Sequence, residues 1–300
     1  MDKYLIINAD DFGMCHAHNL ATFDLFKKGG ITSATIMAPC SWAYEAVKFA
    51  KENPEFAIGV HWTLTSEWGT YRWGPLARNN TDSLRDEEGF LWKESDQVEE
   101  NADSEEIEAE VVAQIEHLKN LGLDPSHVDN HMGSIYGIET GRLELLNIAI
   151  DVAGRYGFPF RFPGKILDMM ESATESQMNL VKLDRETIEM VAKKFTEFAE
   201  RRGVAMPDYL MSSEWDGPQG DNYENYKEYM YEYYRAMKPG VSETFIHPAL
   251  ESEELKGICG SWRRRVWEHR LHAEPETRQH IEACGIKLIN YRDLKKMRFN

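Results

Sequence analysis

Short apolar runs alternate with longer amphipathic segments along most of the chain. Apolar runs bounded by Gly, Pro or Asp are typical of buried strands, whereas apolar residues three and four positions apart are typical of helices. The runs predict strands at 4–7, 33–37, 57–60, 126–131, 158–162, 209–213, 244–246 and 286–290. The amphipathic segments predict helices at 16–28, 42–52, 104–121, 140–155, 185–202, 222–237, 262–269 and 275–283.

Regular alternation of strands and helices favours a parallel sheet, because parallel strands need a long crossover connection. Seven or eight mainly parallel strands predict an α/β fold in which the sheet closes, or nearly closes, into one (β/α) barrel. We expect this barrel to span residues 1–300 as a single domain, since the length is ordinary for a barrel. In barrels of this kind the chemistry lies at the carboxyl ends of the strands.

The helix at 104–121 carries the clearest local signals. Ile107, Val111 and Ile115 follow one another at helical spacing and predict a buried face. Asp103 and Glu106 stand at the positions of a capping box, and Gly122 follows the last turn.

Residues 66–103 interrupt the alternation, because they are polar and lack a sustained period. An insertion of this length in a compact domain is usually a functional loop or lid. Trp68, Trp73 and Trp92 lie within it. Their rings could stack on the apolar face of a sugar, or they could pin the loop to the body of the protein.

The composition excludes several classes of function. A formal net charge of -17 disfavours a nucleic-acid partner, because the phosphates would be repelled. No apolar run approaches the ~18 residues of a membrane span, and no basic segment precedes an apolar one at the start, so we expect a cytoplasmic protein. The scattered cysteines, without a C-x-x-C pair, indicate a reducing compartment.

A single dense basic run stands at 263–265, between Trp262 and Trp267. Its helical pattern favours a local clamp for an anion or a carboxylate over a nucleic-acid patch. Several histidines fall on predicted helices, where we interpret them as surface or packing residues: His16, His18, His117, His269, His272 and His280.

Polar side chains gather where the predicted strands end. Asp10 and Asp11 follow the first strand, and His61 ends the third. Both carboxylates can line one cleft if the strand gives way to a loop there, although Asp-Asp-Phe-Gly is also compatible with an ordinary turn. Other strand ends carry His127, Asp129, His131, Arg161, Glu214, Asp216 and His247.

One Asp and two His can hold a divalent cation and leave a coordination position open. Asp11, His61 and His131 are the candidates. Such a metal makes hydrolysis of an amide feasible near neutral pH, with a neighbouring carboxylate as base. His247 at another strand end could protonate the leaving amine. Each histidine can instead be a structural group.

The sequence resembles the YdjC-like carbohydrate deacetylases, which are related to polysaccharide deacetylases. The resemblance rests on 8–13, 59–65, 127–131, 246–248 and 285–294, and it covers most of the chain in order. It implies a distorted (β/α) barrel, a divalent metal that is Mg²⁺ or Zn²⁺, and removal of acetyl from an N-acetylated sugar.

By position, the resemblance implies metal ligation by Asp11, His61 and His131. It implies that Asp10 is the base and His247 the acid, with Arg161 near the base. The family pattern differs in two places: Met132–Ser134 lacks a histidine that the family usually carries there, and Ala249 replaces a glycine. Neither difference touches the metal set.

Further expectations concern the substrate and the partners. His127, Glu214, Trp68 and Trp73 are candidates for substrate binding, the substrate is a small carbohydrate, and the chain could form a homodimer. Two other functions stay open from the residues. One is hydrolysis of a different bond, such as a phosphate ester or another acyl group, and the other is carbohydrate binding without turnover.

Overall fold

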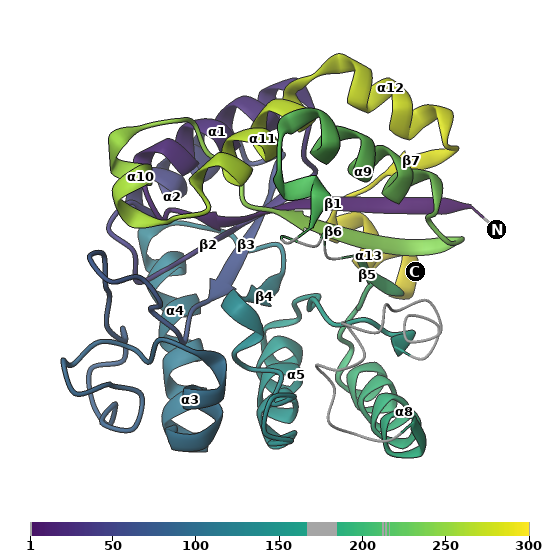
Figure 1. Ribbon diagram of the computed structural model, residues 1–300. Helices are drawn as coiled ribbons and strands as arrows, with labels where there is room; N and C mark the ends of the chain where they lie inside the picture. The colour runs from purple at the N-terminus through teal and green to yellow at the C-terminus, as the bar shows by residue number, and fades with distance from the viewer. Residues whose placement is uncertain (1, 167–184, 212, 214, 216, 300) are drawn as a thin grey trace.

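The computed structural model describes residues 2–166, 185–211, 213, 215 and 217–299 of the chain. Its centre is a sheet of parallel strands in the order β4-β3-β2-β1-β6-β5, with β7 also paired to β1 (Figure 1). The strands are β1 (Lys3–Phe12), β2 (Ser33–Ile36), β3 (Ala57–Trp62), β4 (Val128–Asn130), β5 (Tyr209–Met211), β6 (Gly240–Ile246) and β7 (Ile286–Leu288).

Strand β1 is the axis of the sheet, and it pairs with three other strands. Along one edge its first residues pair with β7 and its last residues pair with β2, while β6 follows the other edge. The sheet curls into a half-barrel, which confirms the predicted α/β class and the parallel, distorted barrel.

Helices form a belt around the sheet, since parallel strands are buried on both faces. Contacts run from α8 through α5, α4 and α2 to α1, and on through α11 to α12 and α9. No helix of the described residues is long and apolar enough to cross a membrane. The helices are α1 (His16–Lys28), α2 (Ala43–Glu52), α3 (Ser95–Asn101), α4 (Ser104–Leu121), α5 (Glu144–Tyr156), α8 (Arg185–Arg202), α9 (Tyr223–Arg235), α10 (Glu253–Ile258), α11 (Trp262–Ala273), α12 (Pro275–Ala283) and α13 (Tyr291–Phe299), with 3₁₀ turns η1 (His131–Gly133) and η2 (Pro218–Gly220).

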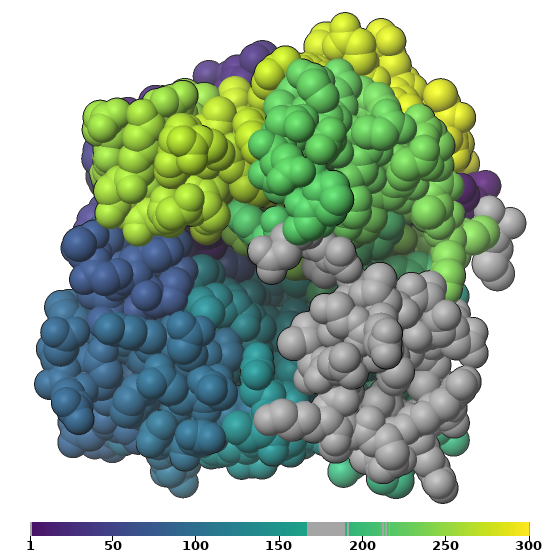
Figure 2. All heavy atoms as spheres, viewed as in Figure 1, coloured from purple at the N-terminus to yellow at the C-terminus, as the bar shows by residue number. Residues whose placement is uncertain are grey.

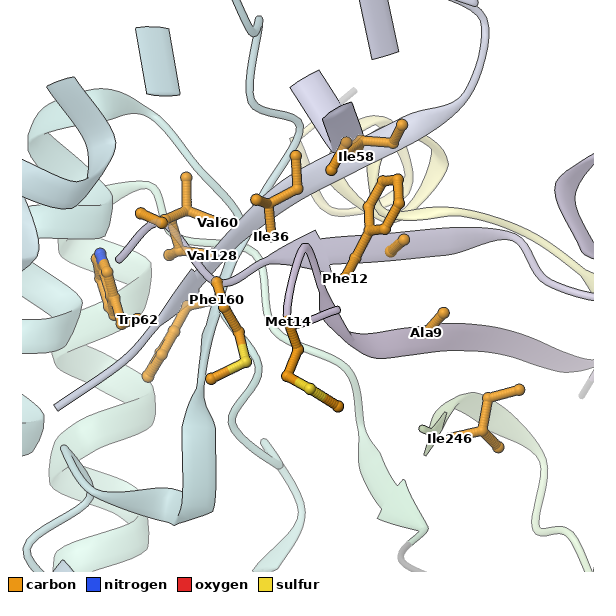
Figure 3. Close-up of a cluster of buried hydrophobic side chains, with 14 of the residues drawn as sticks. Ala9, Phe12, Met14, Ile36, Ile58, Val60, Trp62, Val128, Phe160 and Ile246 are labelled. Atoms are coloured by element: carbon orange, nitrogen blue, oxygen red, sulfur yellow. The ribbon is translucent and has the colours of Figure 1, made fainter. Parts of the chain in front are cut away.

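The core around the strand ends is built from large apolar side chains (Figure 3). Phe12 of β1 packs edge-on against Phe49 of α2, with ring centroids 6.4 Å apart. Trp62 at the end of β3 lies 5.7 Å from the Phe160 ring. Phe12, Trp62 and Phe160 are completely buried. Full burial of a Phe side chain contributes about 1.5–3 kcal/mol to the stability of the fold. This packing fixes the strand ends that carry the polar residues.

Three local predictions need correction. Residues 158–162 were predicted as a strand, but they form a single β-bridge, between Val128 and Phe160. Pro159 has no N–H to donate to a longer ladder. The insertion contains a helix, α3, which Glu94 and Gln97 cap reciprocally. At α4 only half of the predicted capping box exists. Asp103 accepts from two backbone N–H groups, whereas the Glu106 carboxylate turns away to Ser83.

Candidate functional site

A pocket with a volume of about 400 Å³ opens at the carboxyl ends of the strands. Figure 2 shows the face of the molecule that is hollowed between the green segments of the C-terminal half and the teal segments from the middle of the chain. The six residues predicted as catalytic or metal-ligating line this pocket together: Asp10, Asp11, His61, His131, Arg161 and His247.

A bulge in β1 turns two adjacent carboxylates toward the pocket. Ala9 pairs with Ala34 and Phe12 with Ile36, so β1 holds one residue more than β2 between these pairs. Side chains of successive strand residues normally point to opposite faces, and a bulge breaks that rule. Asp11 has a left-handed backbone with φ 58°, a conformation that Asp tolerates better than most residues. Asp10 and Asp11 therefore share one cleft.

Asp11 lies between two imidazoles. Its Oδ1 atom is 3.4 Å from Nε2 of His61 and 3.2 Å from Nδ1 of His131. Its Oδ2 accepts a hydrogen bond from Arg265 at 2.7 Å, but the buried Oδ1 has no hydrogen-bond partner among the described residues. A buried carboxylate oxygen without a partner is costly, and a cation between the three atoms would satisfy it.

The outer nitrogens of both imidazoles contact carboxylates. His61 Nδ1 lies 2.7 Å from Asp129 Oδ1, and His131 Nε2 lies 3.0 Å from Glu67 Oε2. A carboxylate on one ring nitrogen fixes the tautomer and directs the lone pair of the other nitrogen to a metal. The candidate ligand atoms of Asp11, His61 and His131 all lie within 4.8 Å of one another. The donor set therefore fits a divalent metal.

The electrostatics of this group also favour a cation. Burial opposes charge on His61, but the carboxylates of Asp129 and Asp11 raise its pKa to about 9. Against the same effect of burial, Glu67 and Asp11 raise the pKa of His131 to about 10. The acidic surroundings thus favour positive charge on this group, which a bound metal would supply in place of protons.

Asp10 has a different environment. Arg161 donates two hydrogen bonds of 2.6 Å, one to each carboxylate oxygen, and Asn8 donates a third to Oδ1 at 2.9 Å. Burial alone would raise the pKa of Asp10, but Arg161 lowers it to about 2. Asp10 is therefore ionised at any physiological pH and can accept a proton.

Arg161 is itself held by two further carboxylates. Its Nη2 atom lies 2.8 Å from Asp129, and its Nε donates to Glu243 at 2.8 Å. Burial opposes the charge of Arg161, but the carboxylates of Asp10, Asp129 and Glu243 outweigh it and raise the pKa of Arg161 well above its ordinary value. Arg161 thus positions Asp10, and it lies beside the proposed base, where the sequence resemblance placed it.

His247 lies across the pocket, next to the ring of Trp215 at a centroid distance of 5.4 Å. Burial lowers the pKa of His247, although Asp11 opposes the shift. Its Nδ1 atom has no hydrogen-bond partner among the described residues, while its backbone N–H donates to Glu268 at 2.6 Å. The imidazole is therefore neutral near pH 7 and must gain a proton before it can act as an acid.

Two charged residues of the pocket lining, Arg265 and Glu67, were not predicted as site residues. The basic run 263–265 predicted a carboxylate clamp, and Arg265 indeed binds the Asp11 carboxylate. His18 accompanies it, since its Nε2 lies 2.9 Å from Arg265 Nη1, so this buried histidine belongs to the surroundings of the site. Glu67 lies near the start of the insertion, and no local pattern marks it.

The four residues expected to bind substrate lie in different places relative to the pocket. Trp68 lines the pocket. Trp73 is buried outside the described pocket lining, with its indole N–H donating to the Thr65 carbonyl, so it pins the insertion. His127 is completely buried beneath the pocket, which corrects the expected substrate contact. Glu214 lies outside the described residues.

A scan against protein-family models matches residues 4–283 to the YdjC-like protein model. The chain belongs to the YdjC-like family. A carbohydrate deacetylase of Geobacillus stearothermophilus is 37% identical over 99% of this chain and 100% of its own length. A chitooligosaccharide deacetylase of Yersinia enterocolitica is 27% identical over 98% of this chain and 100% of its own length.

A solved structure from Enterococcus faecalis shares the fold of this YdjC-like chain. It is a protein proposed to act in cellobiose-phosphate cleavage, with a TM-score of 0.74 and 28% identity over 98% of this chain and 99% of its own. Of the two departures from the family pattern, the segment 132–134 contributes Met132, 41% exposed, and Gly133 to the pocket lining, and Ala249 is completely buried.

Proposed function

We propose that this chain is a metal-dependent hydrolase that removes the acetyl group from an N-acetylated sugar. The observation that carries the proposal is the unpartnered, buried Oδ1 of Asp11 between the inner nitrogens of His61 and His131. The ionised Asp10 lies beside it. The deacetylase names of full-length relatives in the YdjC-like family support the reaction class.

The donor set favours zinc among divalent metals. Two imidazoles and one carboxylate suit Zn²⁺, whereas Mg²⁺ prefers oxygen ligands in octahedral geometry. A metal held by Asp11, His61 and His131 supplies Lewis-acid chemistry, since it lowers the pKa of water toward ~7 and polarises a carbonyl oxygen.

Two side chains of the protein then carry out two proton transfers. Water adds to the amide carbon, and Asp10 takes the proton that the water loses. The pKa of Asp10 is about 2, so this carboxylate gives the proton up to solvent, and His247 takes up a proton from solvent before it acts. His247, once protonated, gives a proton to the nitrogen as the C–N bond breaks. The products are acetate and the amino sugar.

The walls of the pocket suit a sugar ring. Trp68, Trp215 and Phe245 line it, together with the partly exposed Met132. Aromatic faces stack on the apolar C–H faces of pyranose rings, while the polar floor meets the amide. A small carbohydrate is therefore the substrate class that the pocket fits best.

Acetate release tests the proposal directly. Metal-free protein is loaded in turn with Zn²⁺, Mg²⁺ or no metal and incubated with a panel of N-acetylated mono- and oligosaccharides. We expect acetate with the metal and none after chelation, with Zn²⁺ bound most tightly. Hydrolysis of an aryl phosphate without acetate release would favour a phosphatase. Sugar binding by calorimetry without any turnover would favour a binding protein.

A further inference from the structure

Four buried polar side chains lie behind the proposed base, outside the described lining of the pocket. Each has 0% exposure, and they come from four separate places in the chain. Buried polar groups that take no part in chemistry still need partners, and the partners show what the groups do. The four residues are Asn8, His127, Glu243 and Tyr291.

One side of this group runs from Asp10 to the terminal helix α13. Arg161 donates a hydrogen bond to each oxygen of Asp10, and its Nε–H donates to Glu243 Oε1 at 2.8 Å. The other oxygen of Glu243 accepts a hydrogen bond from the Tyr291 hydroxyl. The first residue of α13 is thus joined to the proposed base through two intervening side chains.

The other side returns from Tyr291 to Asp10. The His127 ring stacks on the Tyr291 ring with centroids 3.8 Å apart and an interplanar angle of 13°. His127 Nε2 lies 3.1 Å from Asn8 Oδ1, and Asn8 Nδ2 donates to Asp10 Oδ1. The amide oxygen can only accept, so His127 carries its proton on Nε2. Its Nδ1 then accepts from the neighbouring Ser126 hydroxyl at 2.8 Å.

We propose that a closed positioning ring fixes the orientation of the Asp10 carboxylate. The ring consists of Arg161, Glu243, Tyr291, His127 and Asn8, with Tyr291 as its remote member. The inference rests on the proposed function of Asp10 as the base. A carboxylate offers about four lone pairs. Oδ1 uses two of them for Asn8 and Arg161, while Oδ2 uses one for Arg161. The ring therefore leaves Oδ2 as the atom that accepts the proton.

The ring also explains residues that the pocket chemistry leaves unused. Asn8 and Tyr291 lie in the first and last motifs of the sequence resemblance, at opposite ends of the chain. Strand β7 and the following residue pair with β1, which brings the start of α13 beneath Asp10. The C-terminal segment is thus tied to the base through Tyr291, and it does more than cover the sheet.

Tyr291→Phe tests the ring with the least disturbance, because the stack on His127 stays and only the hydroxyl is lost. We expect kcat to fall roughly ten- to a hundredfold, since small misplacements of reacting groups cost about that much. KM and bound metal should stay unchanged. Tyr234→Phe is the matched control, because this buried tyrosine also gives up one hydrogen bond, to His272 at 2.9 Å, away from the pocket. Its kcat should equal that of the wild type.

A double variant distinguishes a ring from independent contacts. Asn8→Ala opens the ring on the opposite side of Asp10. Once one contact of the ring is lost, Asp10 is no longer held, and losing a second contact should lower kcat little further. The double variant should therefore show nearly the same kcat as the more impaired single variant. Losses in kcat that multiply would overturn the ring, as would an unchanged kcat in Tyr291→Phe.

Crystal structures of the metal-loaded variants give a result that does not depend on turnover. The ring predicts a rotated or divided Asp10 carboxylate in Tyr291→Phe and the wild-type orientation in Tyr234→Phe. If the wild type releases no acetate, the proposed function fails, and these structures still decide the ring. One fixed Asp10 orientation in all three proteins would overturn it.

Discussion

The two halves of the pocket floor surround neighbouring carboxylates with different partners. On one half, Asp11 has a buried oxygen without a hydrogen-bond partner among the described residues, faced by two imidazole nitrogens. On the other half, both oxygens of Asp10 are bound by donors from Arg161 and Asn8. Each carboxylate also binds one guanidinium, Arg265 on the Asp11 half and Arg161 on the Asp10 half, so the two imidazoles around Oδ1 are what distinguish the Asp11 half.

This difference supports two proposed functions for one Asp-Asp pair. Both residues are buried aspartates, so their partners separate the proposed metal ligand from the proposed base. Asp129 joins the halves, because one of its oxygens contacts His61 and the other contacts Arg161. Changes on either half should therefore affect metal binding and proton transfer separately, unless they reach Asp129.

The largest effect is expected on the Asp11 half. Asp11→Asn removes the charged ligand, so metal affinity should fall more than the roughly 10- to 100-fold typical of a residue behind a ligand, and turnover should fall below detection. Metal content after dialysis and acetate release measure the two effects. Asp24→Asn is the control, since this carboxylate pairs with Lys28 and His269 away from the pocket. Full metal content in Asp11→Asn would contradict the assignment.

The next effect separates the two halves. Asp10→Asn should lower kcat about 10²- to 10⁴-fold, the usual contribution of a positioned acid or base, because an amide cannot accept the proton. Metal content should stay at the wild-type level, as measured by elemental analysis of the purified variant. Loss of metal from this variant would mean that the roles of Asp10 and Asp11 are reversed.

A smaller effect concerns the wall above the Asp11 half. The Trp68 ring centroid lies 6.4 Å from that of His131, and the ring lines the pocket. Trp68→Ala should raise KM roughly two- to tenfold through the lost stacking, with little change in kcat. Trp73→Ala serves as the contrast, because the loss of a buried Trp should lower unfolding stability by about 3–5 kcal/mol. Equal effects of both variants on KM would show that Trp68 only supports the loop.

The smallest effect is a pH dependence on the Asp10 half. Burial raises the pKa of Glu243 to about 7, with Arg161 opposing the shift. The folded-state pKa lies above the ordinary value, so the contribution of Glu243 to stability is complete below pH ~4.5 and is lost as the pH rises through 7. Glutamine stays neutral at every pH. The melting temperature of Glu243→Gln minus that of the wild type should therefore increase from pH 5 to pH 8. A difference in melting temperature that is constant with pH would rule out this titration.

The local pattern was enough to predict most of the fold. Helix α1 begins at His16 and ends at Lys28, as predicted, directly before Gly29 and Gly30. Burial on both faces of a parallel sheet requires apolar runs, so strands could be read from the sequence as well. The same reasoning brings Asp11, His61 and His131 together, because the carboxyl ends of parallel strands meet at one edge of the sheet.

Only the tertiary structure decided which partner each of these residues has. The bulge that turns Asp10 and Asp11 into one cleft is a change of register between β1 and β2, and no residue in either strand specifies it alone. Arg265 reaches Asp11 across 254 positions of sequence. Trp68 and Trp73 lie in the same insertion and each precedes a glycine, but only the folded insertion exposes one of them to the pocket and buries the other. Apolar periodicity is a local property, whereas hydrogen-bond partners depend on the packing of the whole chain.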